Sequence, residues 1–353
     1  MGTDEKREYY FALEGIRGIA AILVAIRHFQ PTLSQIQSPM SFLAVDLFFA
    51  ISGFVIASSY EHKMQSGALT FKNFFIYRLI RLYPLYILGS GIGLIWLVLS
   101  QDEGSLRIGI VTILTLSFLP NPLSGLSAFP VNAPAWSLFF ELTMSIVYGL
   151  WLCTASNRKV VITTALAFVG FTAVIIIHGD ADVGFQKIYL PVGMLRITSL
   201  FGFGLLAFRC REHIIAFVPT MRNAGTTILY LMVIAILAAP ISKLAPYATL
   251  YSIAVVSFGV PAIICIAIRA NPTGQLRSVS LFLGRISFPL YAIHSPVYQL
   301  GSEIYDGLLP GKPPVSSWIG LLALAATVVL AAFLNRYYDI PARGWLRRTL
   351  DNH

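Results

Sequence analysis

The sequence has few charged residues and few cysteines. Only 12% of its 353 residues are charged, about half the share of a typical soluble domain, and 56% are hydrophobic. This combination excludes an ordinary soluble enzyme and a disordered chain, because neither carries so much apolar surface. The three cysteines (Cys153, Cys210 and Cys265) stand singly, without CxxC or Cys/His ligand spacing. We therefore expect neither a disulfide framework nor a metal site.

Long apolar runs are abundant instead. They fall at 11–29, 41–60, 84–100, 106–120, 135–154, 160–178, 190–208, 225–242, 247–268, 280–300 and 315–335. All except 106–120 approach the roughly 20 residues that a bilayer-spanning helix needs. We expect an all-α, polytopic helical membrane protein, with one integral-membrane domain over 1–353, no appended soluble domain and no cleavable signal peptide. The short run near 106–120 is interpreted as a re-entrant or interfacial segment.

The distribution of basic residues supports this interpretation. If 106–120 does not cross and the N-terminus is cytoplasmic, 17 basic residues lie in inner segments and four lie outside: Arg107, Lys187, Lys243 and Lys312. If 106–120 does cross, the numbers become nine inside and 12 outside. The positive-inside rule favours the first arrangement, so we expect ten crossings with both termini in the cytoplasm. The formal net charge of +9 then reflects topology, and no nucleic-acid partner is expected.

Several ionisable residues nevertheless fall inside the apolar runs, among them Glu14, Arg17, Arg27, His28, Asp46, Glu141, Arg196, Arg285 and His294. A charge at the centre of a membrane helix costs roughly 2.5–3.5 kcal/mol even on insertion scales, so such residues are normally paired or face a cavity. Their number predicts a polar interior, as in a membrane enzyme or a secondary transporter.

Arg17 and His28 share one face of the first run. Their separation of 11 residues places them about 20° apart around a helix and about 16 Å apart along it. Glu14 precedes Arg17 by three residues and can pair with it, which is the structural alternative for Arg17. For His28 the alternative is a hydrogen-bonded packing histidine.

Three further residues are candidates for a catalytic site. Asp46 follows Val45 in the second run and has Arg27 as a candidate structural partner. Glu141 lies one to two turns into its run, where it is expected to orient His28 or to pair with an intramembrane arginine. His294 follows Pro289 in an interrupted run, and its alternative role is that of a satisfied histidine in a kinked packing helix.

Arg78 and Arg81 form a basic pair in the inner loop that precedes the third run. Their i, i+3 spacing puts both guanidinium groups on one face of a helix at the inner surface. Such a pair suits bidentate recognition of phosphate. The alternative is a positively charged anchor in an interfacial helix.

Taken together, these segments resemble the membrane acyltransferase-3 family. The resemblance rests on five pieces that occur in family order, with a familial ending at Tyr338–Arg343: LEGIRGIAA with His28, VDLFF with SGF, RLIRLYP, AWSL with Glu141, and ISFPLY with His294. Each piece alone is weak, but five in order cover most of the chain. The family consists of O-acyltransferases that modify sugars, surface polysaccharides and some small natural products.

The resemblance implies a cytoplasmic acyl-CoA donor, with acetyl-CoA as the default, and transfer to the hydroxyl of a carbohydrate. It implies that Arg17 and His28 are the family's R-x10-H pair, with His28 as general base, and that Arg78 and Arg81 contact the phosphates of CoA. We also expect Tyr83 to contact the donor. A last group of residues is expected to contact the acceptor: Asn132, Trp136 and Ser137.

The mechanism that follows from these roles is proton removal from the acceptor hydroxyl by His28, with Glu141 steadying the imidazolium and Arg17 helping to stabilise the oxyanion. An acyl-histidine intermediate is the mechanistic alternative. The expected setting is a bacterial cytoplasmic membrane, and the acceptor is a glycan or another hydroxyl compound, in free or lipid-linked form. A secondary transporter is the rival function, and a non-catalytic lipid-binding subunit is a third.

Overall fold

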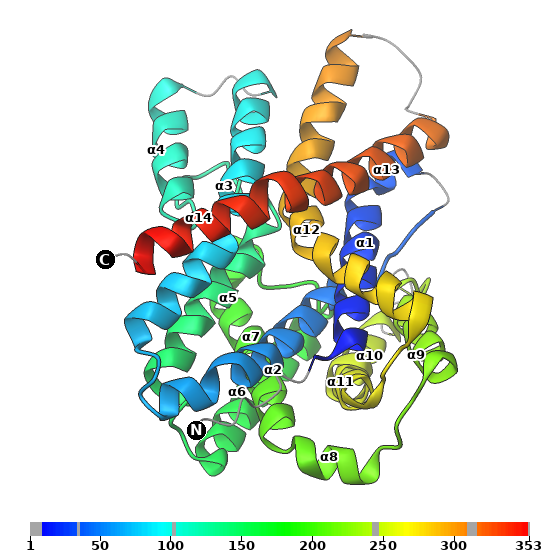
Figure 1. Cartoon of the computed structure of the whole chain (residues 1–353). Coiled ribbons are helices and arrows are strands. Elements are labelled where there is room, and N and C mark those ends of the chain that lie inside the picture. The colour runs from blue at the N-terminus through cyan, green and yellow to red at the C-terminus, as the bar shows by residue number, and fades with distance from the viewer. Residues whose placement is uncertain (1–8, 34–35, 101–103, 242–246, 309–315, 352–353) are drawn as a thin grey trace.

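A computed structural model describes residues 9–33, 36–100, 104–241, 247–308 and 316–351. Within these ranges nearly all regular structure is helical, and a single isolated bridge joins Met221 to Ala270. The predicted all-α architecture is therefore confirmed. Figure 1 shows the helices gathered into one bundle.

Fourteen α-helices are described, with five short 3-10 or π segments between or beside them. In chain order the elements are α1 (Phe11–Leu33), η1 (Ser41–Leu43), α2 (Ala44–Gln65), α3 (Phe71–Ser100), α4 (Ser105–Leu116), α5 (Ala135–Val147), η2 (Tyr148–Leu152), α6 (Asn157–His178), η3 (Lys187–Tyr189), α7 (Leu190–Arg209), α8 (Arg211–Phe217), α9 (Asn223–Leu237), α10 (Tyr247–Ala254), η4 (Val255–Gly259), α11 (Val260–Arg269), α12 (Gly274–Leu308), α13 (Ser317–Leu334), η5 (Asn335–Asp339) and α14 (Ile340–Asp351).

The predicted multi-pass membrane character is confirmed. Seven helical segments among the described residues are long and apolar enough to cross a bilayer: Ser41–Gln65, Phe71–Ser100, Ala135–Leu152, Asn157–His178, Lys187–Arg209, Tyr247–Arg269 and Ser317–Leu350. α1 and α12 have 23 and 35 residues, but they carry the polar residues of the site described below. The count of ten crossings and the cytoplasmic termini stay predictions. Residues 1–8 and 352–353, and the outer-loop candidates Lys243 and Lys312, lie outside the described residues.

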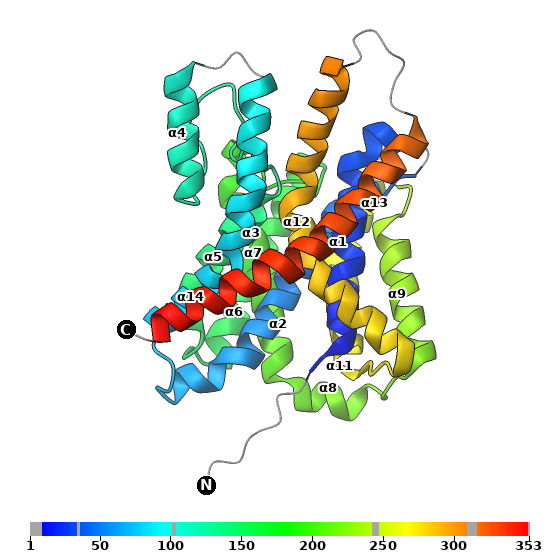
Figure 2. The same ribbon diagram turned by 45° about the horizontal axis from the view of Figure 1, so that its top comes forward.

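α4 is short, as expected for 106–120, and its re-entrant placement stays a prediction. Its 12 residues extend about 18 Å, well short of a hydrocarbon core of about 30 Å. The hydroxyl groups of Tyr83 and Tyr86 donate to the carbonyl oxygens of Leu116 and Thr115, at 2.7 and 2.8 Å, and so fasten its C-terminal end to the middle of α3. Figures 1 and 2 show α4 beside only one half of α3.

Two close helix pairs form the centre of the bundle. α1 packs along α12, and α2 packs along α7. Both contacts depend on glycine: a Cβ atom on Gly18 would overlap Leu283 of α12, and one on Gly53 would overlap the carbonyl of Phe201 in α7. Small residues let membrane helices approach closely where lipid supplies no hydrophobic driving force.

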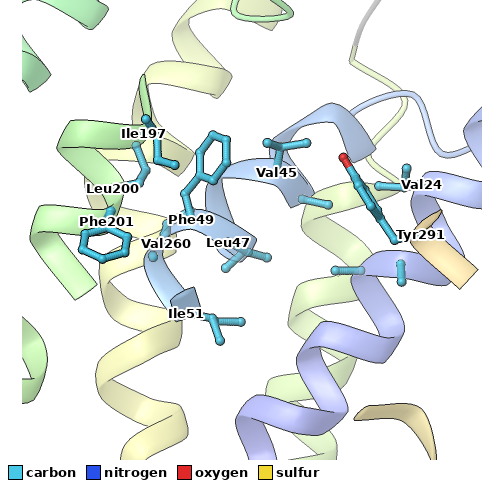
Figure 3. Packing of buried hydrophobic residues seen from close by; sticks show 14 of the residues in the cluster. Val24, Val45, Leu47, Phe49, Ile51, Ile197, Leu200, Phe201, Val260 and Tyr291 are labelled. Carbon is cyan, nitrogen blue, oxygen red and sulfur yellow. The ribbon is translucent and has the colours of Figure 1, made fainter. Parts of the chain in front are cut away.

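The apolar core lies between these helices. Figure 3 shows Phe49 of α2 directed toward Ile197 and Leu200 of α7, with Tyr291 of α12 close to Val24 of α1. All five side chains are at least nine-tenths buried. This packing holds α1, α2, α7 and α12 in register, which is what positions the polar residues on them.

Candidate functional site

A cavity lies where α1, α2, α3, α5 and α12 meet. Its volume is about 130 Å³. Three arginines (Arg17, Arg78 and Arg81) and Glu141 line it, with Ser52, Ser137, Ser287 and Tyr291 as its polar neutral side chains. Phe48, Phe49, Phe288 and aliphatic side chains complete the walls. The predicted arginines are therefore brought together in one cationic cavity.

Two of the cavity arginines have carboxylate partners. Arg17 lies 3.3 Å from Glu14, which confirms the i, i+3 pair expected from the sequence. Arg78 forms an ion pair with Glu141, and its Nε donates to the Ser145 hydroxyl at 3.2 Å. These contacts hold both guanidinium groups against the cavity wall.

Arg81 differs from its two neighbours. Its guanidinium lies 5.3 Å from the centre of the Phe288 ring and has no hydrogen-bonding or carboxylate partner among the described residues. A largely buried arginine without a directly bonded anion carries a desolvation cost, which the contact with Phe288 offsets only in part. The cavity thus keeps a cation that is ready for an anionic ligand.

His28 and His294 form a contact pair on α1 and α12. The Nε2 atom of His294 lies 3.2 Å from Nδ1 of His28, and the ring centres are 4.7 Å apart at an interplanar angle of 69°. His294 is fully buried, while His28 is partly exposed. The sequence placed both in the outer halves of their helices, but it did not pair them.

The carbonyl groups around the two rings decide which nitrogen atoms carry protons. Nδ1 of His294 lies 3.0 and 2.9 Å from the carbonyl oxygens of Leu290 and Tyr291, which only accept hydrogen bonds, so it carries a proton. Its Nε2 is then an acceptor in the neutral ring. Nδ1 of His28 faces that acceptor and the Val24 carbonyl at 3.0 Å, so it is protonated in turn. The Nε2 atom of His28 is left with a free lone pair.

Tyr291 stands between the cavity and the histidine pair. Its ring lines the cavity and lies 5.7 Å from the ring of His294, and its hydroxyl is 2.6 Å from that of Ser137. Phe48 packs edge-on against it at 5.4 Å. These side chains form the wall of the cavity nearest to the histidines, and His28 itself does not line the cavity.

Asp46 has a structural partner, and it is not the one expected. Both of its carboxylate oxygens accept hydrogen bonds from Arg196 of α7 at 2.7 Å, and both side chains are completely buried. Arg196 also donates to the carbonyl groups of Val183 and Phe42. Both carboxylate oxygens are thus engaged by Arg196, and the expected catalytic role of Asp46 stays a prediction. The expected partner, Arg27, binds elsewhere.

Glu141 and Arg17 also lie apart from His28, contrary to their expected roles beside it. Glu141 accepts hydrogen bonds from Ser52, at 3.1 Å, and from Arg78. It therefore lines the cavity and forms the pair with an intramembrane arginine that was its alternative role. Arg17 lines the same cavity, about 16 Å along α1 from His28. That spacing is too long for a shared oxyanion contact. His294 occupies the place at His28 that was expected for Glu141.

Three predicted binding residues point away from the cavity. Tyr83 is 38% exposed, its hydroxyl binds the C-terminal end of α4, and it does not line the cavity. Trp136 is buried between Phe49 and Phe140 with Arg196 over its ring. Asn132 is buried and donates to the Ala292 carbonyl at 3.0 Å, which fixes the loop before α5 to α12. Of the expected acceptor residues, only Ser137 lines the cavity.

An ion pair between Arg27 and Asp182 lies at the end of the bundle nearer His28. Arg27 bonds to Asp182 at 2.7 Å and to the Pro39 carbonyl at 2.6 Å. Burial raises the pKa of the Asp182 carboxyl above its usual range, and the charge of Arg27 opposes this shift. The pair ties the 180–186 loop to the end of α1 next to His28.

Some site residues were not assigned from the sequence. Ser287 and Tyr291 line the cavity from α12, one turn apart and one turn before His294. Their spacing of four and then three residues was the signal, since it places all three on one helix face. No group of three or more His, Cys, Asp or Glu side chains suited to a metal ion occurs within the described part of the chain.

The fold and the site define a polytopic membrane protein in which a cationic cavity lies next to a histidine pair. A family model described as an acyltransferase domain matches residues 10–336, nearly the whole chain. The protein therefore belongs to the acyltransferase-3 family and is an acyltransferase that transfers groups other than aminoacyl groups. This membership decides against the transporter alternative.

Curated relatives agree with this assignment. The chain is 36% identical to protein 2 of the picA locus of Rhizobium radiobacter, over 46% of this chain and 92% of that one. It is 22% identical to the peptidoglycan O-acetyltransferase OatA of Listeria monocytogenes over 97% of its own length but only 57% of the relative. It is 27% identical to the acyltransferase MdmB of Streptomyces mycarofaciens, over 87% and 82% of the two chains. No solved structure matches the chain.

Proposed function

We propose that this enzyme takes an acyl group, with acetyl as the default, from acyl-CoA on the cytoplasmic side and transfers it to a carbohydrate hydroxyl, with His28 as general base. The observation that carries the proposal is the hydrogen-bond chain through His294, which leaves the Nε2 lone pair of His28 free. The relative OatA is named a peptidoglycan O-acetyltransferase, which supports O-acetylation of a glycan, and MdmB is named an acyltransferase.

In the proposed reaction, Nε2 of His28 removes the proton from the acceptor hydroxyl as its oxygen attacks the thioester carbonyl. The carbon–sulfur bond breaks, the acyl group stays on the acceptor oxygen, and the proton passes from His28 to the departing CoA thiolate. His294 keeps the attacking tautomer of His28 through its own Nε2 atom. Its imidazole performs the orienting role that was expected of Glu141.

The donor occupies the cavity in this proposal. The free guanidinium of Arg81 and that of Arg17 face the phosphates, while Glu141 partly neutralises Arg78. From that position the pantetheine arm must pass the wall formed by Phe48 and Tyr291 to bring the thioester to His28. A bacterial cytoplasmic membrane is the proposed location, because it offers cytoplasmic acyl-CoA on one side and surface glycans on the other.

The test uses full-length purified protein in lipid nanodiscs with radiolabelled acetyl-CoA and a panel of peptidoglycan fragments and oligosaccharides. We expect CoA release that depends on the acceptor, together with label on the glycan, and loss of both with His28→Ala at unchanged protein level. CoA release without label on any acceptor contradicts the proposed acceptor class. Near-normal transfer by His28→Ala contradicts the assigned base.

A further inference from the structure

Three arginines line the cavity, and a fourth, Arg343, lies outside its lining on α14, which contacts α3; all of them except Arg81 have their own carboxylate. The pairs are Arg17 with Glu14, Arg78 with Glu141, and Arg343 with Asp339. Arg81 has none in the described part of the chain. Arg343 and Asp339 lie on α14 and η5, beyond the residues that the family model matches.

The Asp339–Arg343 pair is held tightly against α3. Nη2 of Arg343 lies 2.6 Å from Oδ2 of Asp339, whose side chain is completely buried in the π-helical turn between α13 and α14. The hydroxyl of Tyr338, the residue before Asp339, donates to the Pro84 carbonyl of α3 at 3.2 Å. Figures 1 and 2 show α14 crossing α3, and the two helices are in contact.

η5 and α14 bring the Asp339–Arg343 pair against the stretch of α3 that carries Arg81. Tyr338, next to Asp339, is hydrogen-bonded to Pro84, and Arg81 lies three residues before Pro84 on α3. Because the one carboxylate here is paired with Arg343 and Arg81 has none within the described residues, this part of the structure carries a net positive charge. Two planar guanidinium groups suit the oxygens of a phosphate.

We propose that Arg343, positioned by Asp339, joins Arg81 in binding a phosphate at the nucleotide end of the acyl donor, so that α14 is part of the donor site. The inference rests on the proposed function, because it takes acyl-CoA as the donor. Asp339 is a positioning residue: it fixes the Arg343 side chain but does not touch the ligand. π-helical turns such as η5 frequently occur at functional sites.

The phosphate could belong to a lipid headgroup instead, because α14 exposes Ile340 and Trp345 beside its basic residues, as an interfacial helix does. The pair could also serve only to hold the bend before α14. Each alternative predicts a different effect of changing Arg343 from the effect that a donor site predicts. The experiment must therefore compare a donor that carries phosphates with a donor that lacks them, and must measure lipid binding separately.

The experiment compares acetyl-CoA with the thioester S-acetyl-N-acetylcysteamine, which has no phosphate, on the full-length enzyme in nanodiscs. We expect Arg343→Ala to raise the KM for acetyl-CoA about ten- to hundredfold, the worth of a hydrogen bond between charged groups. The kcat, and kcat/KM for the phosphate-free donor, should be unchanged. Asp339→Asn should raise the same KM to a smaller extent. Arg348→Ala, which removes an exposed arginine of the same helix, is the matched control and should behave as wild type.

The outcomes separate the hypotheses. An unchanged KM for acetyl-CoA in Arg343→Ala, or an equal loss with both donors, overturns the inference. A loss confined to binding of vesicles that contain phosphatidylglycerol overturns it in favour of a lipid. If Arg343→Ala does not fold, Arg343→Lys replaces it, because it keeps the charge and loses the bidentate geometry. Failure of wild-type enzyme to use acetyl-CoA at all contradicts the proposed function rather than the role of Arg343.

Discussion

His28 and His294 are joined by a contact of 3.2 Å between Nδ1 of the first and Nε2 of the second. They are 266 residues apart in the chain and meet because α1 and α12 approach at glycine. The carbonyl groups behind His294 make this contact directional, since they require the proton on its Nδ1. The arrangement is a hydrogen-bond relay that ends at the free Nε2 atom of His28.

The relay predicts that His294 affects the rate of transfer and not donor binding. His294→Ala removes the acceptor that holds the Nδ1 proton of His28, so the other tautomer can form and the base is lost part of the time. We expect kcat to fall about 10²-fold, within the usual range for general base catalysis, with the KM for acetyl-CoA unchanged. Initial rates of acceptor-dependent CoA release measure both.

The double variant provides the control for this prediction. Residues that act as a unit are strongly non-additive, so His28→Ala with His294→Ala should be no slower than His28→Ala alone. His62→Ala changes an exposed histidine at the end of α2 and should keep wild-type rates. Wild-type kcat in His294→Ala would show that His28 works without the relay.

Glu141 is expected to influence the donor and not the base. Its carboxylate pairs with Arg78 in the cavity, so Glu141→Gln removes a negative charge from the proposed site of an anionic ligand while its amide still accepts a hydrogen bond. We expect the KM for acetyl-CoA to fall about three- to tenfold, as for loss of one charge at an effective dielectric of about 20. The pH profile of kcat should stay unchanged. Glu141→Asp keeps the charge and serves as control. A lowered kcat with a shifted pH profile would restore Glu141 as the partner of His28.

Much of the fold followed from apolar periodicity and loop charge. It was predictable that the segment at 106–120 is too short to span a bilayer, and the 12 residues of α4 agree. The Arg17–Glu14 pair was predictable because it is local in one helix. Such features depend only on the length of one segment and on the spacing of residues within it, and both can be read directly from the sequence.

Contacts between distant helices were harder to predict. Asp46 pairs with Arg196 across 150 residues, and nothing local to either run distinguishes Arg196 from Arg27 as the partner. The positions of His294 and Glu141 within their runs placed both at about the depth of His28. The sequence did not show which of the two side chains faces His28, and the structure shows that His294 does. Depth in the membrane can be estimated from position in a run, but the facing of one helix toward another depends on side-chain packing.

The Asp46–Arg196 pair should be structural. Both side chains are fully buried, so Asp46→Ala leaves an unpaired buried cation and should cost about 3–5 kcal/mol. We expect a lower melting temperature and less folded protein in detergent, with kcat per folded molecule close to wild type. Asp46→Ala combined with Arg196→Leu removes both charges and should recover part of the stability. Full stability with abolished kcat would instead mark Asp46 as catalytic.

The topology prediction can be tested at the turn after α4. Gly125 lies in the loop between α4 and α5, and its φ of +79° suits a glycine turn at the surface. If α4 enters and returns on one side, a cysteine at the neighbouring Ser124 is labelled from outside intact cells by a membrane-impermeant maleimide. Ser66→Cys, in the loop between α2 and α3, should be labelled only after lysis. The native cysteines are replaced first. Protection of Ser124→Cys in intact cells, together with labelling of Ser66→Cys in intact cells, would invert the whole chain and place Arg78 and Arg81 on the outer side, away from cytoplasmic acyl-CoA.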